Sequence, residues 1–299
     1  MARAAETFER GILSWSEQRA PRTRWTLALI WALLLIILLT TGLLPLLWLA
    51  KAAVTPTHDT ISNPLAIFPS GQIEWGNLAE AWTGGRIGMF LLNTVEIAAG
   101  TVILTLVVGL TAAYVVSVLR PRWASVFMGA ILATLFIPGV ISLVPLYLTV
   151  LSVPPFGVNL LNTYWAIWLP SSANAVVILI VRRFFDGIPA ELFDAARVDG
   201  AGPLRVFLLI ALPLSRPIIG VVALLTAVSA WKDFLWPLIV ISDGSKQPIS
   251  VALAQNAQST TFSLQLAGMF LALLVPVTLF LIFQNSFLRG VSAAGGVKQ

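Results

Sequence analysis

Long apolar stretches alternate with short polar segments along the whole chain. A helix needs roughly 20 apolar residues to cross a hydrocarbon core about 30 Å thick, and each stretch is near or above that length. A membrane β-barrel would instead show alternating segments of roughly ten residues, and this pattern is not seen. The chain is therefore predicted to be an all-α integral membrane protein with six transmembrane helices. They lie in the stretches 27–50, 89–119, 124–151, 164–181, 217–241 and 264–288.

These stretches divide the chain into five regions. We predict an N-terminal segment at 1–24, a first transmembrane helix at 25–51, a loop at 52–88, a core of five transmembrane helices at 89–288 and a tail at 289–299. The first helix is expected to be retained, because its apolar run is longer than that of a signal peptide. Cleavage at the weak pattern Ala50-Lys51-Ala52 is the alternative. The loop contains several prolines and glycines without a helical period, so an extended conformation is expected there.

The composition supports a membrane protein and excludes several kinds of site. The chain is 58% hydrophobic and 10% charged, whereas soluble domains carry about 25% charged residues. There is no cysteine, so disulfides and thiolate metal sites are excluded. The single histidine, His58, is interpreted as a solvated loop residue. We therefore expect no metal site and no catalytic dyad in this chain.

The positive charges indicate an orientation rather than a nucleic-acid partner. The net charge is +5, and Lys and Arg collect in cytoplasmic loops of membrane proteins. If the N-terminus lies inside, 14 of the 18 Lys and Arg residues fall on the inner side. Both termini are then cytoplasmic, and the loop at 52–88 is extracytoplasmic. The inner residues are Arg3, Arg10, Arg19, Arg22, Arg24, Arg120, Arg122, Arg182, Arg183, Arg197, Arg205, Arg216, Arg289 and Lys298.

The polar segment between the fourth and fifth stretches predicts a short cytoplasmic helix at about 189–201. Pro189 suits a helix start, and the negative charge of Glu191 suits the helix dipole near that start. Gly200 suits a helix end, and Pro203 prevents simple continuation. A second helix then leads into the fifth stretch. The short helix is either a docking site for another protein or an ordinary amphipathic loop helix.

The same segment resembles the EAA signature of ABC importer permeases. The match consists of Asp194-Ala195-Ala196, then Gly200 after three residues, then Ile210-x-Leu212-Pro213 after nine. It departs from the family at Asp194, which stands where Glu is usual. The resemblance implies a type-1 ABC importer permease whose short helix couples to an ATPase subunit. The coupling residues would be Glu191, Asp194, Ala195, Ala196 and Gly200.

Weaker motifs extend the resemblance to the carbohydrate branch of that family. Asn93-Thr94 opens the second stretch as in the permease core, and Trp231-Lys232-Asp233-Phe234 resembles the WN[DE]F stretch, with Lys232 in place of Asn. The tail from Ala293 to Lys298 is similar to that of the smaller maltose-type permease subunit. The implied substrate is a sugar, and the alternative is a phosphorylated polyol or another small polar solute.

The resemblance also implies an assembly in a bacterial or archaeal plasma membrane. Its expected parts are a second permease subunit, in a heterodimer or a homodimer, two ATPase subunits and an extracytoplasmic solute-binding protein. No G-x-x-x-x-G-K-[ST] sequence is present, so this chain is not expected to be an enzyme. ATP and Mg²⁺ would bind to the partner ATPase, and the chain itself would carry no cofactor.

Polar residues within the stretches are candidates for the translocation path. Ionisable groups in a bilayer usually face the bundle interior or a water-filled cavity. Helical spacing places Ser229, Asp233 and Trp236 on one face, and Pro237 leaves the carbonyl of Asp233 without its helical donor. Glu96 lies in the second stretch, and Trp231 belongs to the carbohydrate-branch motif. A structural role for Lys232 and Asp233, which would pair with a partner subunit or with their surroundings, is the alternative.

The two prolines of the third stretch and two rival classes of protein leave further alternatives open. Pro138 and Pro145 in the third stretch predict a hinge or cavity-lining turn, or plain membrane-helix prolines. A secondary transporter would need midplane carboxylates for ion coupling, and only Glu96 and Asp233 are available. A membrane-embedded enzyme would need the histidine, cysteine or clustered acids that the chain lacks. The ABC importer permease explains the cytoplasmic segment, and the two rivals do not.

Overall fold

The computed structural model describes residues 21–66, 68–69 and 71–295. Most of the predicted segment 1–24 and the last four residues of the tail therefore lie outside the described residues. The described part is helical, and its only β-type pairing is one isolated bridge between Val153 and Val158. The α-helices are α2 Pro21–Ala53, α3 Thr57–Ser62, α4 Gly76–Thr83, α5 Ile87–Tyr114, α6 Ala124–Thr134, α7 Gly139–Leu151, α8 Trp165–Ser172, α9 Ala175–Phe185, α10 Ala190–Val198, α11 Pro203–Val206, α12 Leu212–Leu214, α13 Arg216–Lys232, α14 Leu235–Val240, α15 Ile249–Asn256 and α16 Phe262–Gly295.

Three single helices and three bent helix pairs are long and apolar enough to cross a membrane. The single helices are Trp25–Ala53, Ile87–Leu119 and Phe262–Ile282. The pairs are α6 with α7, α8 with α9, and the Pro203–Leu214 segment with α13, bent by 110°, 44° and 77°. The described residues thus give six spans when each pair counts as one, in agreement with the all-α prediction.

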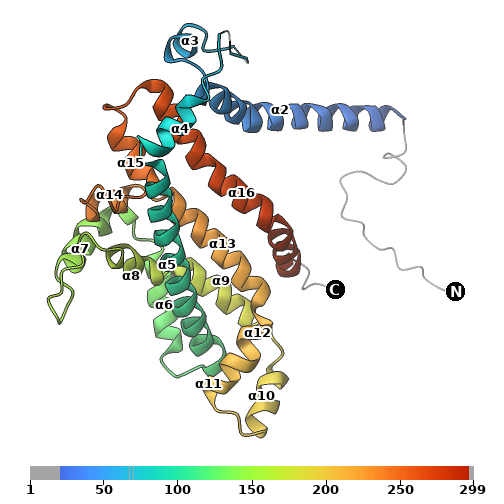
Figure 1. The fold of residues 1–299 in the computed structure, drawn as a ribbon. Helices are drawn as coiled ribbons and strands as arrows, with labels where there is room; N and C mark the ends of the chain where they lie inside the picture. Colours follow the sequence, from blue (N-terminus) through green and yellow to red (C-terminus); the bar gives the residue numbers. More distant parts are fainter. Residues whose placement is uncertain (1–20, 67, 70, 296–299) are drawn as a thin grey trace.

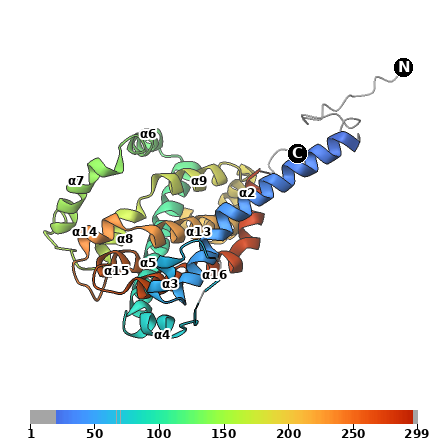
Figure 2. The ribbon, with the colours of Figure 1, turned by 90° about the horizontal axis from the view of Figure 1, so that it is seen from above.

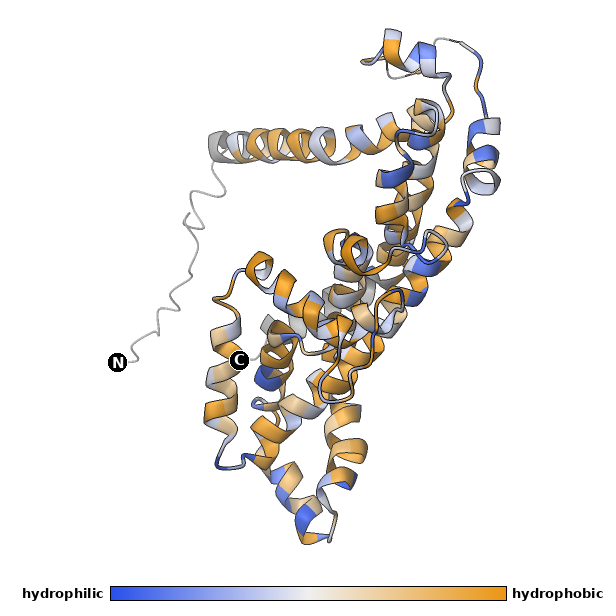
Figure 3. Cartoon of the chain, turned by 90° about the vertical axis from the view of Figure 1, so that its left-hand side faces the viewer, coloured by the Kyte–Doolittle hydropathy of each residue, from blue (hydrophilic) through white to orange (hydrophobic). Residues whose placement is uncertain are grey.

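Helix α5 lies at the centre of the fold (Figure 1) and packs against α8, α9 and α13. Helices α2 and α16 pack against each other, and α2 extends beyond the rest of the body (Figure 2). The outer part of α2 is exposed and mostly hydrophobic (Figure 3), as expected for a helix that meets lipid or a partner. Apolar burial in the described residues is therefore concentrated around α5.

The third apolar stretch differs from the prediction of one helix. Helix α6 ends at Thr134, and Pro138 immediately precedes α7. Proline cannot donate a backbone hydrogen bond, and the carbonyl of Thr134 instead accepts from the N–H of Ile137 at 3.2 Å. Pro145 is accommodated inside α7. The break predicted at Pro138 is confirmed, and the segment changes direction there instead of continuing straight.

The fifth apolar stretch is also interrupted, which corrects its predicted course. Helix α13 ends at Lys232, and Asp233 has an extended conformation with φ −65° and ψ 126°. The carbonyl of Asp233 accepts a hydrogen bond from the Ser250 hydroxyl at 2.7 Å. A side chain from another segment thus takes the place of the donor that Pro237 cannot supply. The short helix α14 then follows in a new direction.

The loop at 52–88 is not wholly extended as predicted, because it contains α3 and α4. The N–H of Glu74 donates to the carbonyl of Val54 at 2.8 Å, which closes the segment on itself. Helix α4 buries Asn77 and Ala81 against its surroundings. These contacts are tertiary, so the local spacing of apolar residues does not reveal the helices.

Candidate functional site

Helix α10, which carries the motif, lies at one end of the molecule, opposite α3 and α4 (Figure 1). It begins after Pro189 and has Glu191 in its first turn. It ends near Gly200, whose φ of +79° lies in the left-handed region. Glycine adopts this conformation without the steric cost that a Cβ brings. The predicted short helix and its glycine end are confirmed.

Phe193 anchors α10 in the core of the bundle. Its side chain is 5% exposed and belongs to a buried cluster with Tyr114 of α5, Phe185 of α9 and Val222 of α13. The guanidinium of Arg197 adds a hydrogen bond to the carbonyl of Val118 at 3.3 Å. Phe193 therefore joins α10 to a buried cluster shared by α5, α9 and α13.

The faces of α10 divide the predicted motif residues into two groups. Glu191, Asp194, Ala195 and Gly200 are exposed. Ala196 is half-buried and packs against the cluster that holds Phe193, which corrects the expectation that both alanines face a partner. Of the two motif alanines, Ala195 is the one that is fully exposed.

The polar groups of this face interact locally and leave most of its surface free. The Asp194 carboxylate pairs with Arg197 at 2.9 Å, and both side chains are largely exposed. Exposed pairs of this kind contribute about 0–1 kcal/mol, so the pair orients the groups more than it stabilises the helix. Large apolar side chains also lie open nearby, since Val198 is 87% exposed and Leu204 69% exposed. The combination is an unpartnered, mixed polar and apolar face.

A second set of bonds ties the ends of neighbouring helices together behind α10. The Ser117 hydroxyl donates to Asp186 at 2.6 Å, and Arg120 donates to the carbonyl of Ser117 at 2.6 Å. The Tyr114 hydroxyl donates to the carbonyl of Pro203 at 2.9 Å. The segment after α10 is thus bonded to α5 through Tyr114.

The predicted path residues do not form one surface. Glu96 on α5 and Ser229 on α13 are exposed, and Trp231 is half-buried beside a different apolar cluster. Trp236 is 7% exposed and donates its indole N–H to the carbonyl of Ala166 at 2.9 Å. The prediction that Ser229, Asp233 and Trp236 share a helical face is wrong, because α13 ends before Asp233.

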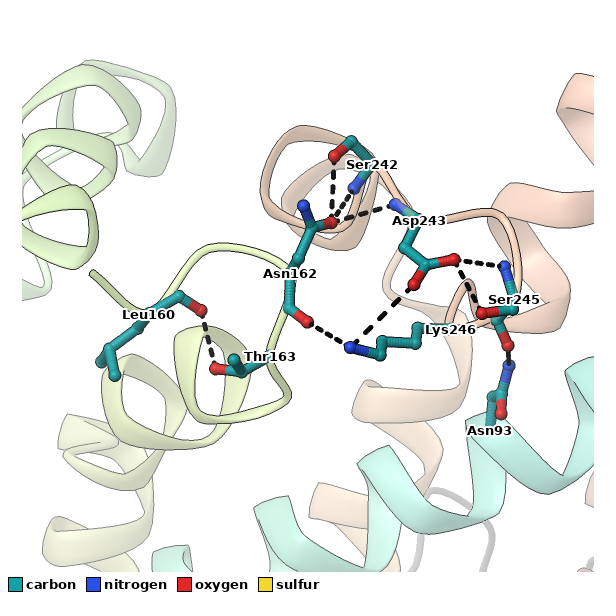
Figure 4. A network of polar contacts seen from close by, with 8 residues as sticks. All are labelled: Asn93, Leu160, Asn162, Thr163, Ser242, Asp243, Ser245 and Lys246. Atoms are coloured by element: carbon teal, nitrogen blue, oxygen red, sulfur yellow. Dashed lines mark hydrogen bonds and ion pairs between the residues drawn. The ribbon is translucent and has the colours of Figure 1, made fainter.

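A network of hydrogen bonds joins three segments that lie far apart in the sequence (Figure 4). We call Asn93, Asn162 and the loop 242–247 the outer clasp. The side-chain oxygen of Asn162 accepts from the Ser242 N–H at 2.7 Å, the Ser242 hydroxyl at 3.0 Å and the Asp243 N–H at 2.9 Å. The Asn93 amide donates to the carbonyl of Ser245 at 2.8 Å. One asparagine side chain thus fixes the start of the loop and another fixes its end.

The electrostatics of the outer clasp favour the charged form of the Asp243 carboxyl group. Hydrogen bonds from the hydroxyl and the backbone N–H of Ser245, with the nearby Lys246, lower the pKa of Asp243 below its ordinary value. Lys246 also donates to the carbonyl of Asn162 at 3.1 Å. Sequence reasoning singled out Asn93 but missed Asn162. The only local signal is that asparagine tolerates the positive φ of 59° found there.

The described residues contain no group of three or more His, Cys, Asp or Glu side chains that could hold a metal ion. The chemistry available to them is hydrogen bonding, ion pairing and apolar contact. The described residues form a helical body with up to six membrane spans around α5 and with the motif-bearing helix α10 at one end. Residues 105–293 match the family described as binding-protein-dependent transport system inner membrane component. The chain belongs to this family, which confirms the resemblance to ABC importer permeases.

The relatives that match this chain over most of its length are named as permease proteins. The probable ABC transporter permease protein YurM of Bacillus subtilis is 32% identical over 284 residues, covering 93% of this chain and 91% of the relative. The arabinooligosaccharides transport system permease protein AraQ of Halalkalibacterium halodurans is 30% identical, covering 93% and 98%. The sn-glycerol-3-phosphate transport system permease protein UgpE of Pectobacterium atrosepticum is 28% identical, covering 80% and 87%.

Solved structures share the fold. A chain of a bacterial ABC transporter involved in the import of the acidic polysaccharide alginate superposes with a TM-score of 0.77 at 20% identity, covering 93% of this chain and 99% of that one. A chain of the alginate transporter in complex with an alginate pentasaccharide-bound periplasmic protein gives a TM-score of 0.63 at 14% identity, covering 91% and 98%. The type-1 ABC importer permease fold is therefore confirmed.

Proposed function

We propose that this chain is a permease subunit of an ATP-driven importer that passes a sugar from an extracytoplasmic binding protein to the cytoplasm. The family description and the arabinooligosaccharide relative support this substrate class. The glycerol-3-phosphate relatives support a phosphorylated polyol as the second candidate. One structural neighbour is in complex with an alginate pentasaccharide-bound periplasmic protein, which supports a solute-binding partner here.

The energy for transport comes from separate ATPase subunits, with ATP and Mg²⁺ bound there and not in this chain. The observation that carries this proposal is the open face of α10, formed by Glu191, Asp194, Ala195 and Gly200, together with the burial of Phe193 on its other side. An ATPase subunit docked on the open face moves α10, and Phe193 passes that motion to the helices around α5. Alternating access of the substrate path follows from this motion.

The test is co-purification of the solubilised chain with co-expressed ATPase candidates. Ala195→Arg and Gly200→Arg are expected to release the ATPase, because a long cationic side chain on the open face prevents close packing. Ala79→Arg on α4 is the matched control, since Ala79 is also exposed but lies at the opposite end. Retention of the ATPase by both α10 variants would count against this docking surface.

Both termini are proposed to lie in the cytoplasm, with the protein in a bacterial or archaeal plasma membrane. In support, the ends of α9 and α5, helix α10 and the start of α13 bring many arginines to the α10 end. Positive residues favour the cytoplasmic side. Reporter fusions after residue 299 and within the loop 52–88 test the orientation, with opposite activities expected. The arginines at this end are Arg120, Arg122, Arg182, Arg183, Arg197, Arg205 and Arg216.

Glu96 and Ser229 are proposed to line the substrate path, because both are exposed on helices that pack against each other. An exposed carboxylate on a spanning helix is costly against lipid and calls for a polar surrounding. Asp233 contributes from the break after α13, while Trp231 and Trp236 support the path from inside. A second permease subunit completes the path from the other side, as a heterodimer.

A further inference from the structure

A cavity of about 310 Å³ lies between α4, α15 and the start of α16. These elements gather at the end opposite α10 (Figure 1), and α15 begins just after the loop 242–247 of the outer clasp. The volume is at the lower end of the roughly 300–1,000 Å³ typical of small-molecule sites, so one sugar ring is the appropriate size. The lining residues are Glu80, Ala81, Gly84, Gly85, Ile87, Ala252, Leu253, Asn256, Ser259, Thr260, Thr261, Leu264 and Gln265.

The polar side chains of this cavity are free to bind a ligand. Within the described residues, the heads of Glu80, Asn256 and Gln265 make no hydrogen bond and no ion pair. The hydroxyls of Ser259 and Thr260 donate to the backbone carbonyl of Asn256, at 3.1 and 3.0 Å, and keep their lone pairs as acceptors. Thr261, whose hydroxyl lies 3.4 Å from that of Ser263, adds a third hydroxyl to the lining, which therefore holds one carboxylate, two amides and three hydroxyl groups.

One wall of the cavity is a glycine turn that keeps the space open. Helix α4 ends at Thr83, and Gly84 and Gly85 follow it. A Cβ on Gly85 would lie 2.6 Å from the carbonyl oxygen of Ala81, so the close turn requires glycine. The wall is backbone, and the polar side chains come from α4, α15, the turn after α15 and α16. Apolar contact is supplied by Ile87, Leu253 and Leu264.

Helix α15 holds its side of the cavity through bonds to the rest of the molecule. The N–H of Ile249 donates to the Thr94 hydroxyl of α5 at 2.8 Å. The amide of Gln247 donates to the side-chain oxygen of Gln255 at 2.9 Å, directly before Asn256. The cavity is thus tied to α5, the helix that carries Glu96.

We propose that this cavity binds one ring of a neutral saccharide or polyol at the outer side of the importer. The inference rests on the proposed function and narrows its substrate class. Amides and a carboxylate match the donors and acceptors of sugar hydroxyls, and the small apolar wall suits the carbon face of a ring. Glu80 is the one charged residue in the lining, which contains no basic residue. An anionic solute meets like charge there, which is unfavourable.

Cysteine protection tests the cavity directly, because the chain contains no cysteine of its own. The variants Asn256→Cys and Gln265→Cys place one thiol each in the cavity. Thr83→Cys, on an exposed position of α4 outside the lining, is the control. The importer complex in membrane vesicles, without its binding protein, is labelled with a water-soluble thiol reagent. The probes are arabinobiose, maltose and sn-glycerol 3-phosphate.

Arabinobiose or maltose is expected to slow labelling of both cavity thiols about tenfold at roughly ten times its Kd, because the unoccupied fraction falls as 1/(1 + [L]/Kd). The control thiol is expected to react at the same rate throughout. Glu80→Gln is expected to weaken this protection, and Glu74→Gln to leave it intact. Unchanged labelling with both sugars overturns the proposal. Equal protection by glycerol 3-phosphate overturns the neutral-ligand assignment.

Uptake measured in parallel distinguishes failure of the cavity proposal from failure of the proposed function. ATP-dependent uptake of either sugar by the wild-type importer, without protection of the cavity thiols, removes the cavity and keeps the proposed function. Absence of uptake for both sugars together with uptake of glycerol 3-phosphate removes the sugar assignment and the cavity proposal with it. Uptake together with protection supports both.

Discussion

Phe193 is the residue through which α10 belongs to the bundle. Its neighbours on α10 are exposed, while its own ring is buried among Tyr114, Phe185 and Val206. A helix of nine residues has little stability alone, so packing of this one side chain holds it in place. In the proposed mechanism, the contact that stabilises α10 is also the contact that transmits its motion.

Phe193→Ala is expected to lower the free energy of unfolding by about 3–5 kcal/mol, the cost of emptying a buried aromatic site. Leu192→Ala is the control, because the adjacent Leu192 is 46% exposed and leaves no cavity when truncated. Thermal unfolding of the detergent-solubilised chain measures the difference. Equal destabilisation by the two substitutions would mean that the Phe193 contact does not hold α10.

Gly200→Ala is expected to destabilise the chain by about 1–2 kcal/mol, because an L-residue is strained in the left-handed conformation. No atom would meet the new Cβ within 4 Å, so the effect comes from φ alone. Gly202→Ala is the matched control, since its φ of −69° suits any residue and its Cβ also meets open space. Denaturant or thermal midpoints of the two variants decide the matter, and equal midpoints would contradict the prediction.

Residue types with special backbone properties were predictable, and side-chain directions were not. Gly200 and Pro138 each act where the sequence placed them, because positive φ and a missing N–H are properties of single residues. Ala196 and Trp236 were assigned to the wrong surroundings. Their directions depend on which neighbours pack against them, and that information lies far away in the chain.

At the scale of elements, the helices follow hydropathy while their breaks follow local hydrogen bonding. The side chain of Asn174 accepts from the N–H of Val177 at 3.1 Å and starts α9 afresh after α8. The Ser215 hydroxyl donates to the carbonyl of Ala211 at 2.6 Å at the 77° bend before α13. Hydropathy predicts six spans, which the described residues give when each bent pair counts as one, but it treats each pair as straight.

The start of the loop 242–247 is held by the side chain of Asn162, about 80 residues away in the sequence. Asn162→Gly is expected to loosen the loop 242–247, because three hydrogen bonds to one oxygen are lost, at a cost of about 1–3 kcal/mol. Glycine keeps the positive φ, so no strain confuses the result. Hydrogen exchange of the loop amides measures the effect.

Asn159→Gly is the control for this prediction. The Asn159 side chain accepts only from the local N–H of Leu161, at 2.8 Å, so its loss is expected to leave the loop 242–247 unchanged. Equal exchange of the loop in wild type and Asn162→Gly would show that the clasp does not order it. Sequence reasoning had no means to find this pairing, since nothing local marks a contact of such separation.

At the scale of the whole molecule, α5 connects the two ends. It carries Asn93 in the outer clasp, Glu96 one turn further on, and Tyr114 in the cluster that holds Phe193. A displacement of α10 is therefore felt along one continuous helix. The sequence predicted this helix and its polar residues, but only the packing shows that it joins the two candidate sites.

Glu96→Gln is expected to reduce ATP-dependent sugar uptake while leaving assembly with the ATPase intact. The substitution keeps the shape of the side chain and removes its charge, so it weakens hydrogen bonding to the solute without disturbing helix packing. Because Glu96 is exposed, stability is expected to change by less than about 0.5 kcal/mol. Uptake in proteoliposomes and co-purification of the ATPase are measured on the same sample, with Glu74→Gln as the carboxylate control. Unchanged uptake would exclude Glu96 from the path, and loss of the ATPase would assign it to assembly. Reduced uptake with an intact complex is the outcome that connects this carboxylate on α5 to the solute rather than to the fold.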